Sequence, residues 1–441
     1  MAIALLSSVV ADLTVGKPAL VSLRTTASVR DALRALKLLV GNVSEISVWE
    51  CVCVGVPGVN VKAHRSNGDV GEQKSPYLHE KCRCVGKVCM QKILCHLATQ
   101  QSLCNPVEAL QEPVTALLSD NFLHMTVEHV DPQASLLEVL QLIEAGVQNL
   151  VVPIMNHGRR CYSQKGVTNE FSNHLQKSHG GQFFCWLTHE DVLRFLLGSI
   201  SVFSPVPMTS IEDLGIIRTD ICLVKVDEDV VSALESIKAA CMEMSAVAVV
   251  EDAEVPGAFN LVGDISCTTL QACNEMVALA LATLSAGDFL LYVEECWHPT
   301  EVAMELIRKK LHEKLGWENI EHDGDVDVNL DKVNLMLQNF EIWEESSSDG
   351  EDSGLESPTG PHDLSRKWPY MHRHSSSKFG MSHKHRSGPI FCNPRSSLVA
   401  VLLQALAYRE HYVWVLRDDG TLLGIVTFSD ILTLMFNCVN I

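Results

Sequence analysis

The sequence predicts an α+β fold built from four copies of one small unit: a strand, a helix, two strands that form a hairpin, and a second helix. The clearest copy, near the C-terminal end, shows this whole order within residues 388–437. Three upstream segments repeat the order in weaker form, and two of them carry a polar insertion at the same place in the hairpin. Because a unit this small cannot bury its own apolar face, the repetition indicates that the copies pack together.

The C-terminal copy shows each element by its pattern of side chains. A short apolar run at 389–392 predicts the first strand, and leucines at helical spacing after Ser397 predict a helix. Two alternating, β-rich segments separated by Asp418-Asp419-Gly420 predict a hairpin. A last helix is expected from Thr427.

The other copies follow the same order with helix starts at Ser28, Ser135 and Val230. Polar segments without periodicity interrupt the hairpins of the first two copies at 54–80 and 156–181, and we interpret them as loop insertions. These patterns place the four copies at residues 10–104, 115–202, 206–277 and 388–437.

Residues 278–387 do not follow the repeat and form an insertion before the last copy. An amphipathic helix that docks on the repeats is expected at 300–315. An acidic tract at 321–356 and a basic, His-containing tract at 366–386 follow it, and their composition predicts a partly disordered segment. The two tracts could fold back on each other, or each could bind a partner.

Composition limits the class of protein. The formal net charge of −20 argues against nucleic acid or an anionic membrane as the main partner, and no apolar run is long enough to span a membrane without charges. The first ten residues are apolar but lack the basic start of a signal peptide. Sixteen cysteines scattered through strands and helices favour reduced thiols, so a cytoplasmic location is expected, with a nuclear one not excluded.

The order of elements, ending in the sequence Gly-Ile-Val-Thr-Phe-Ser-Asp at 424–430, resembles the CBS domain. The four-copy arrangement is similar to plant CBS domain-containing (CBSX-type) proteins and, more distantly, to the gamma subunit of AMP-activated kinases. This resemblance implies that the copies pair, first with second and third with fourth, into two Bateman modules. Their clefts would bind AMP, ADP, ATP or another adenosyl ligand, with no tightly bound cofactor, and would signal to a partner.

The candidate ligand residues lie where the last strand meets the last helix. A threonine followed three residues later by an aspartate occurs there in two copies, as Thr427 with Asp430 and Thr188 with Asp191. A helix N-terminus suits a phosphate, and a carboxylate one turn in can bind a ribose diol. The resemblance implies this ribose-binding role for both residues. The alternative is an ordinary helix-capping pair.

The other two copies depart from this pattern. The third has Ser266 and Thr269, which removes the carboxylate, and the first has Cys89 and Lys92, which removes both groups. The second copy also has Cys185 where the others have glycine, and this side chain would crowd a ligand. We therefore expect at most two intact sites, with the fourth copy the better one.

Arg409 and His411 precede the hairpin of the fourth copy, where gamma subunits of the kinases carry basic residues that face phosphates. The second copy has Gln148 and Asn149 at this point, which favours an uncharged or weakly charged ligand there. The alternative is that Arg409 closes a helix C-terminus, where a cation is favoured.

No motif indicates catalysis or a metal centre. Cys82, Cys84 and Cys89 are close in sequence but lack the spacing of a zinc site, and phosphate-loop, nucleophile-elbow and zinc-protease motifs are absent. The sequence thus favours a non-enzymatic sensor that binds an adenine nucleotide and acts on a protein partner such as a kinase complex or a metabolic enzyme. The competing hypothesis is an interaction scaffold with vestigial clefts.

Overall fold

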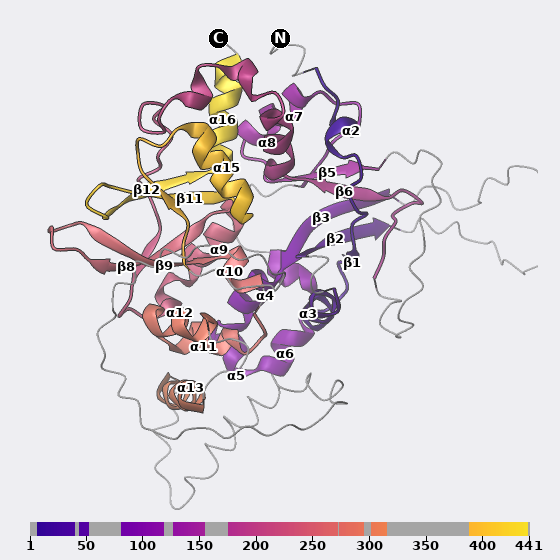
Figure 1. Ribbon diagram of the computed structural model, residues 1–441. Coiled ribbons are helices and arrows are strands. Elements are labelled where there is room, and N and C mark those ends of the chain that lie inside the picture. Colours follow the sequence, from indigo (N-terminus) through magenta and orange to yellow (C-terminus); the bar gives the residue numbers. More distant parts are fainter. Residues whose placement is uncertain are drawn as a thin grey trace, which may run out of the picture.

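The computed structural model describes residues 7–39, 44–52, 81–118, 127–154, 175–271, 273–294, 301–314 and 388–439. These residues form helices and four separate three-stranded sheets (Figure 1). In every sheet the middle strand pairs in parallel with the first strand and antiparallel with the third. The α+β class expected from the sequence, with small sheets, is confirmed.

Each sheet belongs to one strand, helix, strand, strand, helix unit. Unit 1 comprises β1 (Ser22–Arg24), α3 (Val29–Leu38), β2 (Glu45–Val52), β3 (Lys81–Cys89) and α4 (Met90–Leu97). Unit 2 comprises β4 (Val127–His129), α7 (Leu136–Glu144), β5 (Asn149–Pro153), β6 (Phe184–Leu187) and α8 (His189–Leu197). Unit 3 comprises β7 (Leu223–Lys225), the 3-10 turn η5 (Val230–Ala233) leading into α9 (Leu234–Glu243), β8 (Ala246–Asp252), β9 (Phe259–Ser266) and α10 (Cys267–Gln271). Unit 4 comprises β10 (Phe391–Cys392), α15 (Leu398–Tyr408), β11 (Tyr412–Leu416), β12 (Leu422–Thr427) and α16 (Phe428–Val439).

Shorter helices connect the units. They are α2 (Val10–Leu13), α5 (Gln100–Cys104), α6 (Pro106–Gln111), η1 (Val114–Leu118), η3 (Ile200–Phe203) and η4 (Val206–Met208). The helices that the sequence places after Ser28, Ser135 and Ser397 begin there, with an extended residue at each N-cap. The Ser28 and Ser135 hydroxyls accept hydrogen bonds from the amides three residues on, which satisfies donors that a helix start leaves free.

The helices of the units pack crosswise. One apolar core joins units 1 and 3 and includes Leu33, Leu94 and Ile237, while a second joins units 2 and 4 and includes Leu140 and Leu432. In Figure 1 the helices of units 2 and 4 lie in the upper half and those of units 1 and 3 in the lower half. This crosswise contact was not predicted from the sequence.

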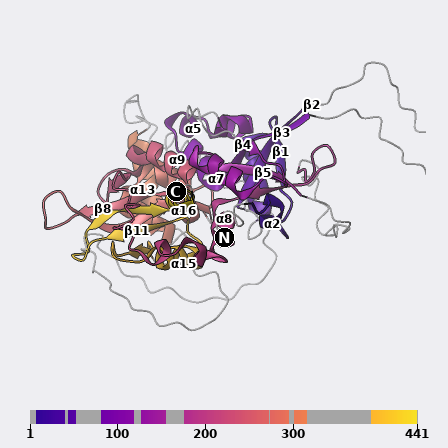
Figure 2. The same ribbon diagram turned by 90° about the horizontal axis from the view of Figure 1, so that it is seen from above.

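The sheets pack differently from the helices. A small core that includes Trp49, Val127 and Val151 joins the sheets of units 1 and 2, and another that includes Ala248 and Trp414 joins those of units 3 and 4. Seen from above, the strands of units 1 and 2 gather on one side and those of units 3 and 4 on the other (Figure 2). Each unit therefore has one neighbour through its sheet and another through its helices.

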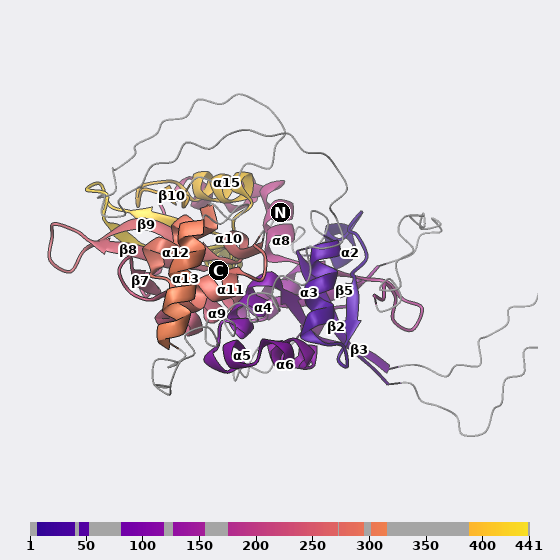
Figure 3. The same ribbon diagram turned by 90° about the horizontal axis from the view of Figure 1, so that it is seen from below.

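The insertion contributes helices to the core of units 1 and 3. These are α11 (Val277–Thr283), which is buried throughout, α12 (Ala286–Glu294) and α13 (Glu301–Lys314). Ile307 and Leu311 of α13 are buried in this core, so the amphipathic helix expected at 300–315 docks as the sequence indicates. Figure 3 shows α12 and α13 on the underside of the molecule. The acidic and basic tracts lie outside the described residues, as do residues 54–80 of the first loop insertion and 156–174 of the second.

Among the helices of the described residues, none is both long and apolar enough to cross a membrane. The described cysteines are free thiols, as the sequence indicates.

Candidate functional site at the strand-to-helix junctions

The junction of β12 and α16 carries the Thr427 and Asp430 pair. Asp430 Oδ2 accepts hydrogen bonds from the Thr427 amide at 2.8 Å and hydroxyl at 2.7 Å, and the Asp430 amide donates to Thr427 Oγ1 at 3.3 Å. The pair is thus a reciprocal helix cap. Both bonds to the carboxylate use the same oxygen, and within the described part of the chain no hydrogen bond reaches Asp430 Oδ1. Capping and ligand contact are therefore compatible at this residue.

Asp430 lies in a partly buried position beside a cation. Burial raises the pKa of its carboxyl group, and the nearby positive charge of Arg218 opposes that shift. The Arg218 guanidinium donates to Glu243 Oε2 at 3.2 Å and stays substantially exposed. The charge of Glu243, the partner of Arg218, acts on Asp430 in the opposite sense.

Unit 2 has the same helix cap, and its carboxylate also forms an ion pair. Asp191 Oδ2 accepts from the Thr188 amide and hydroxyl, each at 2.7 Å. The same oxygen forms an ion pair with Lys17, which follows α2. The charge of Asp191 is thus balanced within the protein, whereas among the residues that the structure describes no ion pair engages Asp430.

Units 1 and 3 lack the carboxylate, as the sequence indicates. Cys89 stands at the N-cap of α4 without a side-chain capping bond, and Lys92 Nζ donates to the Lys87 carbonyl oxygen at 3.1 Å. In unit 3 the Ser266 hydroxyl accepts from the Thr269 amide at 3.2 Å.

The third strands of units 1, 3 and 4 each carry a glycine at a point where another segment of the protein packs closely against the strand. Gly86, Gly263 and Gly424 each lie opposite the point where the pairing shifts by one residue. A Cβ at Gly86 would meet Leu118, one at Gly263 would meet Leu290, and one at Gly424 would clash with the Arg218 carbonyl oxygen. At these points the missing side chain leaves room for another segment of the same protein.

The Arg218 segment extends the sheet of unit 4. The Arg218 amide donates to the Ile425 carbonyl oxygen, and the Ile425 amide donates back to the Arg218 carbonyl oxygen, both at 2.9 Å. This pairing fixes Arg218 beside the end of β12 and explains how a residue far from Asp430 in sequence comes to lie near it.

Charged and titratable side chains from units 1, 2 and 4 lie close to one another. Lys87 Nζ lies 2.7 Å from Glu45 Oε1, and although burial opposes its charge, Glu45 raises its pKa. Burial lowers the pKa of His189 to about 4, and the charge of Lys87 adds to the effect. Burial likewise lowers the pKa of His411, against the opposing charge of Glu190. Charged and titratable groups of units 1, 2 and 4 are therefore close neighbours.

Arg409 and His411 separate in the structure. His411 lies at the junction just described, with its ring against the edge of Phe428 at a centroid distance of 5.4 Å. Arg409 is exposed and occupies the C-cap of α15 with a positive φ of 58°. Arg409 thus closes helix α15, as the alternative interpretation expects. In unit 2 the residue with the matching positive φ is Gly146, not Gln148.

A cavity of about 180 Å³ lies between unit 3 and the start of unit 4, which contributes Gly388, Pro389 and Glu410. Its lining includes Gly263 and Thr269 together with the carboxylates of Asp264, Glu294 and Glu410, and it contains neither lysine nor arginine. Like charges would repel a phosphate there. The cavity therefore suits an uncharged or cationic group better than a nucleotide phosphate.

Sequence reasoning missed Lys17, Lys87, His189 and Arg218. Lys87 has a visible signal, because a lysine inside the otherwise apolar closing strand must have a partner if it is buried. Lys17 and Arg218 lie in connecting segments, where the repeat gives no register to predict their position.

The comparisons with known proteins agree with this architecture. The CBS domain profile matches residues 384–437. The CBS domain-containing protein CBSX5 of Arabidopsis thaliana is 35% identical over 438 residues, which cover 98% of this chain and 97% of that protein. The chain belongs to the CBS domain-containing protein family. CBSX6 of Arabidopsis thaliana, another CBS domain-containing protein, is 29% identical, covering 98% of this chain and 94% of its own length.

Among solved structures, protein MJ1225 from Methanocaldococcus jannaschii is similar to this CBS domain protein. It is described as a candidate archaeal homologue of g-AMPK. Its sequence identity is 14% and its TM-score 0.46, with 96% of this chain and 99% of that chain covered.

Proposed function

We propose that this CBS domain protein is a non-enzymatic regulator that binds an adenosine-containing ligand and modulates a partner protein. Units 1 and 2 would form one Bateman module and units 3 and 4 the other. The sheet-to-sheet cores around Trp49 and Trp414 support this pairing. The observation that carries the proposal is that the carboxylate of Asp430 at the start of α16 caps the helix through Oδ2 alone.

Unit 4 is the proposed ligand site. The Asp430 carboxylate would accept hydrogen bonds from a ribose diol, and Arg218, whose ion pair with Glu243 is largely exposed, would provide a cation for a phosphate. Thr427 is buried and would hold the carboxylate in place through the cap. Unit 2 is a weaker candidate because a ligand there would compete with Lys17 for Asp191. We therefore propose one ligand for each protein molecule.

A scaffold with vestigial clefts is the second candidate function. It is favoured by the chain segments that cover the glycine positions of units 1, 3 and 4 and by the acidic lining of the cavity between units 3 and 4. Under this alternative, a protein partner would be bound without any nucleotide. The partner, for which a kinase complex or a metabolic enzyme are candidates, and the cytoplasmic location stay predictions.

Thermal unfolding of the full-length protein with AMP, ADP, ATP and S-adenosylmethionine tests the proposal. A ligand that binds only the folded state must raise the unfolding midpoint, and at a hundredfold excess over Kd it adds about 2.7 kcal/mol of stability. We expect at least one of these compounds to raise the midpoint and guanosine nucleotides to do so less. If none raises it at millimolar concentration, the scaffold function is the better account.

A further inference from the structure

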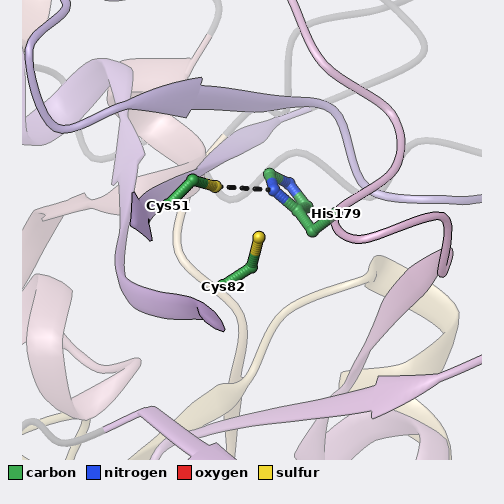
Figure 4. A group of neighbouring side chains, drawn as sticks. All are labelled: Cys51, Cys82 and His179. Carbon is green, nitrogen blue, oxygen red and sulfur yellow. Dashed lines mark hydrogen bonds between the residues drawn. The ribbon is translucent and has the colours of Figure 1, made fainter. Parts of the chain in front are cut away.

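A histidine and two cysteines from both units of the first pair meet at the sheet-to-sheet interface (Figure 4). Cys51 of β2 and Cys82 of β3 are directly opposite partners in the hairpin, and His179 comes from the segment just before β6. Cys51 Sγ lies 3.3 Å from His179 Nδ1. One possible ligand atom from each of the three residues lies within 4.8 Å of the others.

A hydrogen bond to Ser22 positions the ring of His179. The Ser22 hydroxyl donates its single proton to the Gln176 carbonyl oxygen at 2.9 Å. In this orientation of the hydroxyl, Ser22 Oγ accepts from His179 Nε2, which lies 2.8 Å away. With Nε2 protonated, the neutral ring presents the lone pair of Nδ1 toward Cys51. This is the arrangement in which a neighbouring group orients a metal-binding histidine.

Packing also holds the ring in place. Trp49, which is fully buried, stacks on His179 with ring centroids 3.8 Å apart and planes inclined by 6°. His179 is itself 5% exposed. The Cys51 and Cys82 side chains are partly exposed, so solvent can reach their side of the cluster. A rigid imidazole thus faces two accessible thiols.

We propose that Cys51, Cys82 and His179 bind one zinc ion, with two thiolates and Nδ1 as protein ligands and a water in the fourth position. Bonds of about 2.3 Å to sulfur and about 2.0 Å to nitrogen in tetrahedral geometry separate the sulfur and nitrogen atoms by about 3.5 Å. Cys51 Sγ and His179 Nδ1 are 3.3 Å apart. Binding releases both thiol protons to solvent. Two thiolates balance a divalent ion, whereas Cu⁺ would leave a net negative charge at a largely apolar interface.

A second cluster of thiols among the described residues lacks a histidine. Cys89, Cys241 and Cys267 lie 3.5 to 4.0 Å apart between units 1 and 3, with no histidine among them. Hydrogen bonds with Cys241 and Cys89, together with burial, raise the pKa of Cys267, while hydrogen bonds with Cys241 and Cys267 lower the pKa of Cys89. Cys267 therefore provides a matched control cysteine.

Metal analysis of the full-length protein, purified with reductant and then dialysed against added zinc, tests the proposal. We expect one retained zinc in the wild type and in Cys267→Ser, and none in Cys51→Ser or His179→Gln. Ser22→Ala should weaken zinc binding by about 10–100-fold, because it releases the orienting hydrogen bond. X-ray absorption of the wild type, which needs no variant to fold, should show two sulfur neighbours at about 2.3 Å.

Three results would each overturn the proposal. In the first, the wild type retains no zinc or retains Cu⁺ in its place. In the second, the zinc content falls in Cys267→Ser but not in Cys51→Ser. In the third, the absorption spectrum shows no sulfur neighbours.

Discussion

Replacing Trp414 with alanine is expected to lower the free energy of unfolding by about 3–5 kcal/mol, the range for removing a buried aromatic side chain. Trp414 is fully buried where the sheets of units 3 and 4 meet. Its Nε1 donates to Asp264 Oδ2 at 2.9 Å, and the Tyr412 hydroxyl donates to the same oxygen at 3.0 Å. The substitution therefore leaves a cavity and removes a donor from a buried carboxylate.

Denaturant unfolding of Trp414→Ala and Trp414→Phe separates the two effects. Phenylalanine keeps most of the apolar volume but loses the donor, so a smaller loss of about 1–3 kcal/mol is expected. A loss below about 1 kcal/mol for Trp414→Ala would mean that the sheets of units 3 and 4 do not depend on this contact for their packing.

Lowering the pH from 7 to 4 is expected to cost about 3 kcal/mol of stability through His189 alone. Burial lowers the pKa of His189 from 6.5 to about 4 in the folded protein. Between these values the unfolded chain binds a proton that the folded protein does not, so stability falls as the pH falls through this window. The contribution is fully present above about pH 6.5.

Unfolding free energies of the wild type and His189→Gln at pH 7 and pH 4.5 test this effect. Glutamine keeps a polar group facing the Ser429 hydroxyl, which lies 3.2 Å from His189 Nδ1. The variant should lose less stability on acidification, while His411, whose pKa burial also lowers, keeps some acid sensitivity. Equal losses in both proteins would show that His189 titrates normally.

The repeat made the local structure predictable from sequence. Apolar periodicity and capping residues such as Ser28 and Ser135 determine where helices begin, because these signals act within one or two turns. The threonine and aspartate spacing likewise predicted hydrogen bonds that the structure contains at Thr427 and Asp430.

Contacts between distant segments were not predictable in this way. The apolar faces of the four units are chemically alike, so their pattern cannot say that the helices of unit 1 pack on those of unit 3. Lys17 reaches Asp191 from a connecting segment, and His179 is buried although it lies in a stretch interpreted as a loop insertion. Such positions depend on the tertiary arrangement, for which a single sequence without periodicity carries no signal.

Calorimetric titration of the wild type and Asp430→Ala with the adenine compound that raises the unfolding midpoint tests the central claim most directly. Loss of charge-assisted hydrogen bonds to a ribose diol should cost about 1.5–3 kcal/mol, a weakening of roughly tenfold or more. Asp191→Ala is the matched control, because it removes the same cap in unit 2, and it should bind nearly as the wild type does. Equal affinity of Asp430→Ala and the wild type would contradict the proposed ligand site in unit 4.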